Sequence, residues 1–385
     1  MNIVVYLNSI SRLSGGVMDA TRNLYLNSNL ANNISTNIFS YIDKYTEEDK
    51  HLWNSLPLHL YQSQNSFHYN KNLKRDLLSF QSELLHVHGL WQYPHLFMKE
   101  WKTHSSKPLV CSPHGMLDPF IINSQSKMKR LIANLLFNQP LKMVDCFHAL
   151  CLKELEDIRL YGLKQPVAII PNAVNIPENN IKKASNDGKK HLLYLGRLHP
   201  KKGIDLLIYA VSKIKKEKPN ILKNWIIDIV GWDHENSLQN LKLLVKQENL
   251  DSEIIFHGGL FNHQKDEMYL KADVYILPSH GEGLPMTVLE AWSWRTPVIM
   301  TPQCNLNEGF KYNAAIKVDD NVESIKRGIE TTLTMNKEEL NKIGNNGLEL
   351  VKEHFSWDAS AKKMLLLYNW LITKENKPNF IYTDF

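Results

Sequence analysis

The sequence has no apolar run long enough to cross a membrane, few cysteines and little net charge, and each absence excludes a class of protein. A membrane-spanning helix needs about 20 consecutive apolar residues, and no segment of this 385-residue chain approaches that length. The four cysteines show no CxxC spacing, which favours a reducing, cytoplasmic compartment. The net charge of +5 is spread along the chain and gives no case for nucleic acid binding. The opening MNIVVYLNS lacks the features of a signal peptide and begins with a strand pattern.

The chain alternates strand-like and helix-like segments in two blocks, and its length predicts about two domains. In the first block, apolar strands are expected at residues 3–7, 38–42, 84–88, 109–112, 147–150 and 167–170. In the second block, strands at 191–195, 225–230, 254–256 and 274–277 alternate with helices at 203–218, 238–248 and 264–271. This alternation predicts an α/β fold of two doubly wound, Rossmann-like domains that face each other across a cleft.

Between the blocks, residues 176–190 are polar and turn-rich, as in a linker. We therefore expect a first domain at 1–175 and a second at 191–357, with residues 358–385 forming a helix that packs back on the first domain, and a tail. Residues 121–144 are expected to be helical, with four cations among apolar residues: Lys127, Lys129, Arg130 and Lys142. Such a face either contacts anionic lipid at a membrane surface or is simply solvated.

Two loops at strand ends carry residue types suited to a phosphorylated, hydroxyl-rich ligand. In PSHGEGLPMTVLEAWSWRTPVI (278–299), Glu282 lies between two glycines at the end of a strand, and Glu290 lies inside the following helix. Carboxyl ends of parallel strands bind ligands, and free N–H groups at a helix N-terminus attract anions. In GRLHPKKG (196–203), Arg197 and Lys202 follow another strand and could neutralise a diphosphate. The alternative is a solvated cationic loop.

These motifs resemble the paired signatures of retaining glycosyltransferases of family 4, which have the GT-B fold. GRLHPKKG is similar to the family's G-R-L-x-x-x-K-G, and Glu282 and Glu290 have the E-x7-E spacing. IIPNAVN (169–175) resembles the P-N-G-V-D segment at the hinge, with Ala173 and Asn175 substituted. SPHGMLDPF (112–120) resembles a segment of members that build bacterial surface polysaccharides. The end of the chain, from 354 to 371, is similar to the family's terminal helix.

The resemblance implies roles for the charged residues in the two motifs. Arg197 and Lys202 would hold the donor diphosphate and stabilise the charge on the leaving nucleotide. Glu290 would accept hydrogen bonds from the ribose hydroxyls, and Glu282 from hydroxyls of the donor sugar. Transfer would proceed with retention on one face of the sugar, through positioning and electrostatic stabilisation. Neither a metal ion nor another cofactor is implied.

The resemblance also implies backbone contacts and one catalytic histidine. The N–H groups of Gly283 and Leu284, and the glycine loop at Gly15 and Gly16, would approach the donor phosphates. His114, in SPHGMLDPF, would contact the donor sugar or the reacting centre. The alternative for His114 is a structural role in its loop.

Candidate acceptor contacts come from other strand ends of the first domain. His88 and Trp91 lie in HVHGLWQYP (86–94), where an aromatic ring beside polar groups suits stacking on a sugar, although a Trp there can equally be part of the core. Asp118 is either a second polar group near His114 or a turn residue before a proline. His148 and Cys151 are expected to pack in the interior.

Two positions depart from the family pattern. Arg295 stands where the family has a glycine after the helix, a place that often requires the left-handed conformation; either the helix ends differently or Arg295 is strained. Trp292 and Trp294 are bulkier than the family's usual residues, which predicts altered packing behind the site.

The activity that the resemblance implies is transfer of a sugar from a nucleotide-diphosphate sugar to a hydroxyl of a saccharide or a lipid-linked saccharide. The implied setting is lipopolysaccharide, O-antigen or exopolysaccharide assembly at the cytoplasmic face of the inner membrane. Two alternatives remain. One is a non-hydrolysing sugar-nucleotide epimerase, which shares the two-domain architecture, and the other is a catalytically silent scaffold of a polysaccharide-assembly complex.

Overall fold

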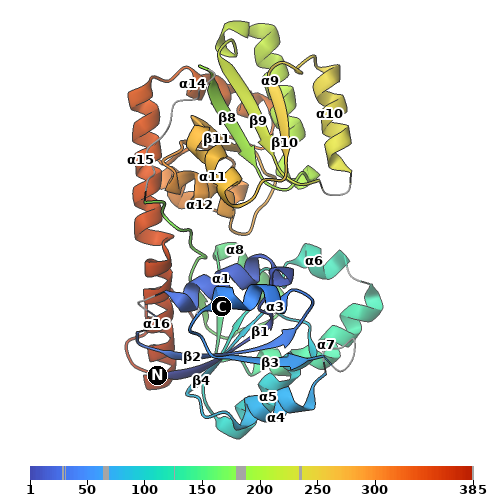
Figure 1. The fold of residues 1–385 in the computed structure, drawn as a ribbon, viewed down its shortest axis with the longest axis vertical. Helices are drawn as coiled ribbons and strands as arrows, with labels where there is room; N and C mark the ends of the chain where they lie inside the picture. Colours follow the sequence, from blue (N-terminus) through green and yellow to red (C-terminus); the bar gives the residue numbers. More distant parts are fainter. Residues whose placement is uncertain are drawn as a thin grey trace. The chain divides into compact units, whose positions relative to one another are not determined.

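The computed structural model of the protein describes residues 1–27, 30, 32–63, 69–124, 126–178, 188–233 and 236–383. The chain forms two compact units (Figure 1). Unit 1 consists of Met1–Asn172 and Trp357–Phe385, and unit 2 of Ala173–Ser356. The chain thus leaves unit 1 three residues before the expected end of the first domain at 175. Residues 179–187 of the expected linker lie outside the described residues.

Unit 1 is built on an eight-stranded sheet with the order β14-β7-β6-β5-β4-β1-β2-β3. Every neighbouring pair is parallel except β14 with β7. The strands are β1 (Asn2–Ser9), β2 (Ser35–Ile42), β3 (Leu58–Gln62), β4 (Leu84–His88), β5 (Leu109–Ser112), β6 (Cys146–Ala149), β7 (Val167–Ile169) and β14 (Ile381–Tyr382). The strand order reverses beside β1, where doubly wound sheets place their ligand sites.

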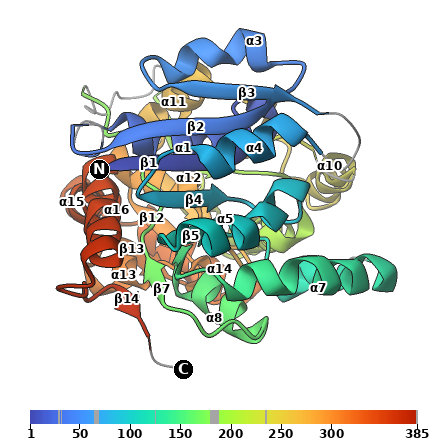
Figure 2. The same ribbon diagram turned by 90° about the horizontal axis from the view of Figure 1, so that it is seen from below.

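Helices cover both faces of this sheet (Figure 2). They are α1 (Gly16–Leu26), α3 (Thr46–Asp49), α4 (Lys71–Ser79), α5 (Phe97–Ser105), α6 (Pro119–Ser124), α7 (Lys127–Lys142), α8 (Leu152–Leu160) and α16 (Trp357–Thr373). The expected return of the C-terminal helix to the first domain is confirmed, because Met364 and Leu367 of α16 are buried in one cluster with Ile3 and Val5 of β1.

The expected helical character of 121–144 is confirmed over most of the segment, which consists of two helices: α6 ends at Ser124 and α7 runs from Lys127 to Lys142. Asn123 and Ser124 are the last residues of α6, and Ser126 precedes α7. Asn and Ser side chains compete with helical hydrogen bonds, which favours the end of a helix here. The side chains of Lys127, Lys129 and Arg130 lie outside the described part of the structure, so the lipid-contacting face stays a prediction. No helix within the described ranges is long and apolar enough to span a membrane.

Unit 2 is a second doubly wound unit with a six-stranded parallel sheet of order β10-β9-β8-β11-β12-β13. Its strands are β8 (Lys190–Leu195), β9 (Trp225–Val230), β10 (Ile254–Gly258), β11 (Val274–Leu277), β12 (Val298–Met300) and β13 (Ala315–Lys317). Its helices are α9 (Ile204–Glu217), α10 (Ser237–Gln247), α11 (Asn262–Lys271), α12 (Met286–Ser293), α13 (Asn307–Lys311), α14 (Val322–Leu333) and α15 (Lys337–His354). The predicted fold class, two Rossmann-like α/β domains, is confirmed.

Glycines accommodate the bulky Trp292. This side chain is fully buried, and its indole N–H donates to the carbonyl of Ala314 at 2.9 Å. A Cβ atom added at Gly347 of α15 would lie 2.3 Å from Cδ1 of Trp292, and one at Gly309 of α13 would lie 2.7 Å from Cζ2. The expected change in packing behind α12 therefore takes the form of glycines on the neighbouring helices α13 and α15, which leave room for the indole ring.

Arg295 occupies the left-handed conformation, with φ of 54°. The N–H groups of Arg295 and Thr296 donate to the carbonyls of Trp292 and Ala291, each at 2.9 Å. This is the hydrogen-bond pattern of a helix that ends on a left-handed residue. Helix α12 therefore ends as in the family pattern, and Arg295 carries the strain.

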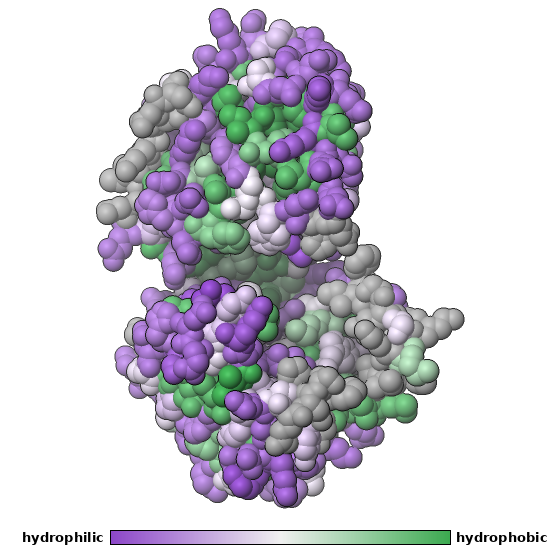
Figure 3. Space-filling model, turned by 45° about the vertical axis from the view of Figure 1, so that its right-hand side comes forward, coloured by the Kyte–Doolittle hydropathy of each residue, from purple (hydrophilic) through white to green (hydrophobic). Residues whose placement is uncertain are grey.

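Unit 2 also exposes an apolar groove away from the motif loops. Figure 3 shows apolar side chains gathered on the face of unit 2 that carries α10 and the edge strand β10. Leu243 of α10 and Ile255 of β10 are largely exposed there and line the groove together with Phe256.

Candidate active site

The two motif loops of unit 2 lie side by side because β8 and β11 are neighbouring strands. The N–H of His280 and the hydroxyl of Ser279 donate to the carbonyl of Lys201, at 2.9 and 3.0 Å. At Gly203, φ is +66° and an added Cβ would lie 2.1 Å from the carbonyl oxygen of Pro278. Only glycine fits this close approach. The glycine that ends the cationic motif therefore allows the two loops to come close enough for these hydrogen bonds.

Lys202 and Glu282 form a nearly buried ion pair between these loops. The ammonium contacts both carboxylate oxygens, at 2.7 and 2.8 Å, and the side chains are only 16% and 11% exposed. The backbone of Glu282 is fixed as well, since its N–H donates to Gln303 at 2.9 Å and its carbonyl accepts from Asn305. An ammonium has three donors, so Lys202 keeps one N–H for a ligand.

Arg197 and the turn before α12 supply donors with no partner among the residues that the structure describes. The Arg197 side chain is exposed at the end of β8. The N–H groups of Gly283 and Leu284 make no hydrogen bond within the described ranges, and an added Cβ on Gly283 would meet only open space. A guanidinium and free N–H groups next to a helix N-terminus are suited to binding an anion.

Glu290 points from α12 towards α11. One carboxylate oxygen accepts from Nζ of Lys265 at 2.7 Å, and the other from the hydroxyl of Tyr269 at 2.8 Å. A carboxylate has about four acceptor positions, so both oxygens keep lone pairs for hydroxyl groups. Lys265 and Tyr269 were not predicted from the sequence, because a carboxylate's partner on another helix leaves no local spacing to detect.

The glycine loop of unit 1 follows β1, beside the point where the strand order reverses. Gly15 has φ of 52° and ψ of −131°, a conformation that strongly favours glycine. Cβ atoms added at Gly15 and Gly16 would meet no atom within 4 Å. The backbone here is therefore open to a close approach, as a phosphate-binding loop requires.

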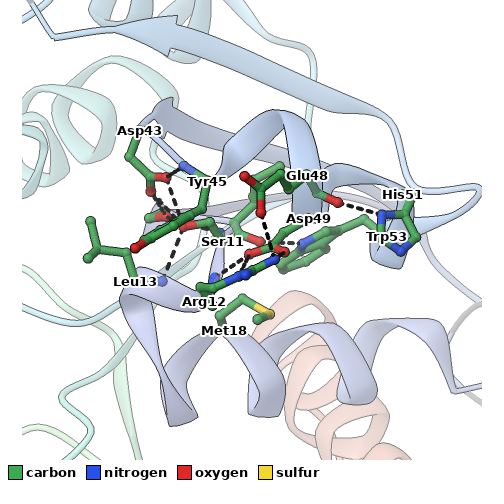
Figure 4. A network of polar contacts seen from close by, with 12 residues as sticks. Ser11, Arg12, Leu13, Met18, Asp43, Tyr45, Glu48, Asp49, His51 and Trp53 are labelled. Carbon is green, nitrogen blue, oxygen red and sulfur yellow. Dashed lines mark hydrogen bonds and ion pairs between the residues drawn. The ribbon is translucent and has the colours of Figure 1, made fainter.

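A polar network holds the residues that precede this loop (Figure 4). The hydroxyl of Ser11 donates to Asp43 at 2.9 Å and accepts from the N–H of Leu13 at 3.1 Å. Arg12 donates to Asp49 through its side chain and, at 2.8 Å, through its backbone N–H. These hydrogen bonds from Arg12 lower the pKa of Asp49 to about 2. The loop is thus anchored to α3 before it reaches Gly15.

His88 and His114 meet in unit 1. Nδ1 of His88 lies 2.9 Å from Nε2 of His114, and the rings stack with centroids 5.2 Å apart. His114 follows β5 with φ of 53°, which is strained for a residue other than glycine. Burial lowers the pKa of His114 to about 3, so its ring is neutral at pH 7. His148, which was expected to pack, is buried in the same region.

Trp91 and Asp118 take part in local structure beside this pair. Trp91 packs against Phe137 and Tyr161, and its indole N–H donates to Met116 at 3.3 Å. The N–H of Asp118 closes a turn onto Gly115 at 3.1 Å. An acceptor contact by either residue stays a prediction. Cys151 is buried, as expected. No group of three or more His, Cys, Asp or Glu side chains in the described part of the chain is arranged to hold a metal ion.

The folds and loops of both units define the class of two-domain, GT-B glycosyltransferases. The family model described as "Glycosyl transferases group 1" matches residues 175–350, and that described as "Glycosyltransferase Family 4" matches residues 39–177. The two matches follow one another along the chain and cover most of it. The chain belongs to the GT-B glycosyltransferases of the family 4 type.

Known proteins agree with this assignment at different levels. The chain is 27% identical to mannosylfructose-phosphate synthase of Agrobacterium fabrum over 181 aligned residues. The aligned region covers 46% of this chain and 40% of that protein. It spans about half the length of the curated relatives it matches. Anabaena HepE in complex with UDP and glucose superposes with a TM-score of 0.71 at 14% identity, over 96% of this chain and 99% of that one. The lipopolysaccharide outer core galactosyltransferase WaaB gives 0.68 at 17% identity, over 98% and 100%. At these identities the solved structures show the shared fold.

Proposed function

We propose that this protein transfers a sugar from a nucleotide-diphosphate sugar to an acceptor hydroxyl, with retention at the anomeric carbon. Unit 2 binds the donor, and unit 1 binds the acceptor. The observation that carries the proposal is the pair of joined loops after β8 and β11. There the Lys202–Glu282 ion pair is accompanied by the Arg197 side chain and the N–H groups before α12, which have no partner within the described ranges. A diphosphate with an attached sugar matches this mixture of positive charge and hydroxyl acceptors.

In this proposal, catalysis consists of stabilising the leaving diphosphate. Arg197 and the third N–H of Lys202 bind its oxygens, and negative charge that develops as the glycosidic bond breaks is met by donors already in place. Glu282 accepts from hydroxyls of the transferred sugar and keeps the Lys202 ammonium oriented. His114 contacts the same sugar. The leaving phosphate takes the proton of the acceptor hydroxyl, so no protein nucleophile and no metal ion are required.

The nucleotide half is recognised by Glu290 and the phosphates by backbone groups. Glu290 accepts hydrogen bonds from the ribose hydroxyls with its unused lone pairs, while Lys265 and Tyr269 hold the carboxylate. Gly283 and Leu284, with the loop at Gly15 and Gly16, approach the phosphates. The structural neighbour HepE, which was solved with UDP and glucose, supports a nucleotide-sugar donor.

The acceptor is a saccharide or a lipid-linked saccharide in bacterial surface-polysaccharide synthesis, and Trp91 and Asp118 contribute to its binding. His88 is buried with its ring nitrogens facing Tyr25 and His114, so it acts through His114. The WaaB likeness supports this setting at the level of the fold. The chain acts in the cytoplasm, where the basic segment at 121–144 is either a solvated face or a peripheral contact to anionic membrane. An epimerase would instead convert the donor without an acceptor, and a silent scaffold would bind no nucleotide sugar.

Thermal unfolding in the presence of UDP-, GDP-, ADP- and dTDP-sugars tests the proposal. A ligand at about 100 times its Kd stabilises the folded state by about 2.7 kcal/mol, so one donor is expected to raise Tm by several degrees. The matched Glu290→Ala variant should show a smaller rise with the same donor. No rise with any of the nucleotide sugars would contradict the proposal and favour the scaffold.

A further inference from the structure

Seven buried or half-buried side chains of unit 1 form one hydrogen-bonded chain that ends at His114. They come from α1, β4, β5, β6, α16 and the loop after β5: Tyr25, His86, His88, Ser112, His114, His148 and Tyr368. His114 is half-buried, whereas His86, His88 and His148 are at most 4% exposed. Burial lowers the pKa of all four histidines, so at neutral pH each ring carries one proton.

At the end opposite to His114, the hydrogen-bonded chain contacts the backbone carbonyl of Ile170, which sets the direction of the first hydrogen bond. This carbonyl lies 2.8 Å from Nε2 of His148, and a carbonyl only accepts, so Nε2 of His148 carries the proton and Nδ1 is bare. The hydroxyl of Ser112, 2.6 Å from that Nδ1, must therefore donate to it. Its oxygen then accepts from Nε2–H of His86, at 2.7 Å.

Nδ1 of His86 is consequently bare and takes a proton from one of two phenols. Tyr368 lies 2.6 Å and Tyr25 2.9 Å from it, and the two phenol oxygens are 2.7 Å apart. One hydroxyl must donate to His86 and the other must bridge the two phenols. In both arrangements the proton of Tyr25 is already used, so Tyr25 can only accept from His88.

This determines the last link. Nε2 of His88 lies 3.4 Å from the oxygen of Tyr25 and must be its donor. Nδ1 of His88 is then bare and accepts from Nε2–H of His114, at 2.9 Å. The opposite order would leave Nε2 of His88 as a buried acceptor facing another acceptor. An unsatisfied buried group of this kind costs enough to disfavour that order by about tenfold or more.

We infer that this chain fixes His114 as the Nε2–H tautomer and presents its bare Nδ1 as a hydrogen-bond acceptor. Nδ1 of His114 has no partner within the described residues. In the proposed enzyme, on which this part of the inference rests, Nδ1 accepts a hydroxyl of the donor sugar. Tyr25 and Tyr368 are positioning residues, and α16 takes part through the Tyr368 hydroxyl.

The structure supplies a matched pair of variants. Tyr25→Phe removes the oxygen to which His88 donates, while Tyr368 can still donate to His86. Tyr6→Phe removes the hydroxyl of another fully buried tyrosine, on β1 of the same sheet, which has no hydrogen-bond partner among the residues that the structure describes. The second variant therefore controls for loss of a buried hydroxyl. If Tyr25→Phe does not fold, Ser112→Ala interrupts the hydrogen-bonded chain at another link. Ser40→Ala is its control, since the Ser40 hydroxyl is buried on β2 with no partner in the described part of the structure.

Long-range 1H–15N correlation spectra of the full chain, labelled with 15N-histidine, report the tautomer of each ring without any ligand. We expect His86, His88, His114 and His148 of the wild type to be Nε2–H. Tyr25→Phe should bring His114 partly to the Nδ1–H form, while Tyr6→Phe should leave it unchanged. A wild-type His114 protonated on Nδ1, or a tautomer unaffected by Tyr25→Phe and by Ser112→Ala, would overturn the inference.

Donor affinity tests the functional half separately. Tyr25→Phe should weaken nucleotide-sugar binding about tenfold, the scale of one hydrogen bond, and leave binding of the free nucleoside diphosphate unchanged. Equal weakening of both ligands, or of neither, would overturn the role of Nδ1. If the wild type binds no nucleotide sugar but shows the expected tautomers, the proposed function fails and the hydrogen-bonded chain stands.

Discussion

At the residue scale, the candidate site of unit 2 combines carboxylates with a place for a negatively charged diphosphate. Carboxylates repel a diphosphate, yet they are the best acceptors for sugar and ribose hydroxyls. Each glutamate is paired with a lysine, Glu282 with Lys202 and Glu290 with Lys265, both at 2.7 Å. Both carboxylates are thereby neutralised in place, and Arg197 remains available to the phosphates.

Glu290→Ala should weaken nucleotide binding by about 1–3 kcal/mol, because hydrogen bonds to a carboxylate are lost. Titration calorimetry with the donor's nucleoside diphosphate measures the effect. Glu267→Ala, on the exposed face of α11, is the control and should bind as the wild type does. Unchanged affinity in Glu290→Ala would remove its ribose role.

The sequence predicts the site residues that belong to contiguous motifs, but not the partners that hold them. Arg197, Lys202 and Glu282 are visible because each follows a strand within a patterned loop. Lys265 reaches Glu290 from another helix, 25 residues away, and no spacing rule connects them. The buried histidine chain of unit 1 is equally hidden, because its members come from six different segments.

At the element scale, α12 is positioned by its fit against α15. Gly347→Ala would place a Cβ 2.3 Å from Trp292, and overpacking of this kind costs about 1–3 kcal/mol. Urea unfolding measures the loss, with Asn345→Ala on the exposed face of the same helix as the control. In a Trp292→Leu background the loss should be much smaller. An equal loss in both backgrounds would show that the two residues are not coupled.

A substitution at the end of α12 should stabilise the protein instead of destabilising it. Arg295 is left-handed, which costs an L-residue about 1–2 kcal/mol, while glycine adopts this conformation freely. Arg295→Gly should therefore raise the free energy of unfolding by about 1 kcal/mol, and Arg295→Ala should not. Thermal unfolding of both variants distinguishes relief of strain from loss of the charge. A gain in Arg295→Ala equal to that in Arg295→Gly would contradict the strain.

At the scale of the whole molecule, the sequence predicts the alternation of strands and helices because the central strands are almost continuously apolar. The predictions at 84–88, 109–112, 225–230 and 274–277 coincide with β4, β5, β9 and β11. Strand β3 was missed because it lies at the sheet edge and is only half-buried. Strand β14 was missed because it has two residues and pairs antiparallel in the tail.

Unit 1 should lose stability as the pH falls below 6.5. Burial lowers the pKa of His95 and His148 to about 4 and of His114 to about 3, and His86 and His88 shift in the same direction. The unfolded chain takes up these protons near pH 6.5 and the folded chain does not, so each histidine contributes up to about 1.4 kcal/mol per pH unit to the loss. Glu154 and Asp157 oppose the trend, since burial raises the pKa of both, but the histidines outnumber them.

Urea unfolding at pH 7, 6 and 5 measures this dependence. The midpoint of unit 1 should fall progressively over the series. A midpoint that stays constant would show that these histidines are not buried in their neutral form.

The release of nucleoside diphosphate, measured with and without an acceptor saccharide, tests the central claim most directly. With the donor found by thermal unfolding, release should require the acceptor, and the product should retain the anomeric configuration. Arg197→Ala should reduce this release about 100-fold or more, as the loss of an electrostatic stabiliser does, while Arg327→Ala, an exposed arginine of α14, should not. Release in Arg197→Ala at the wild-type rate, or conversion of the donor without acceptor, would contradict the account.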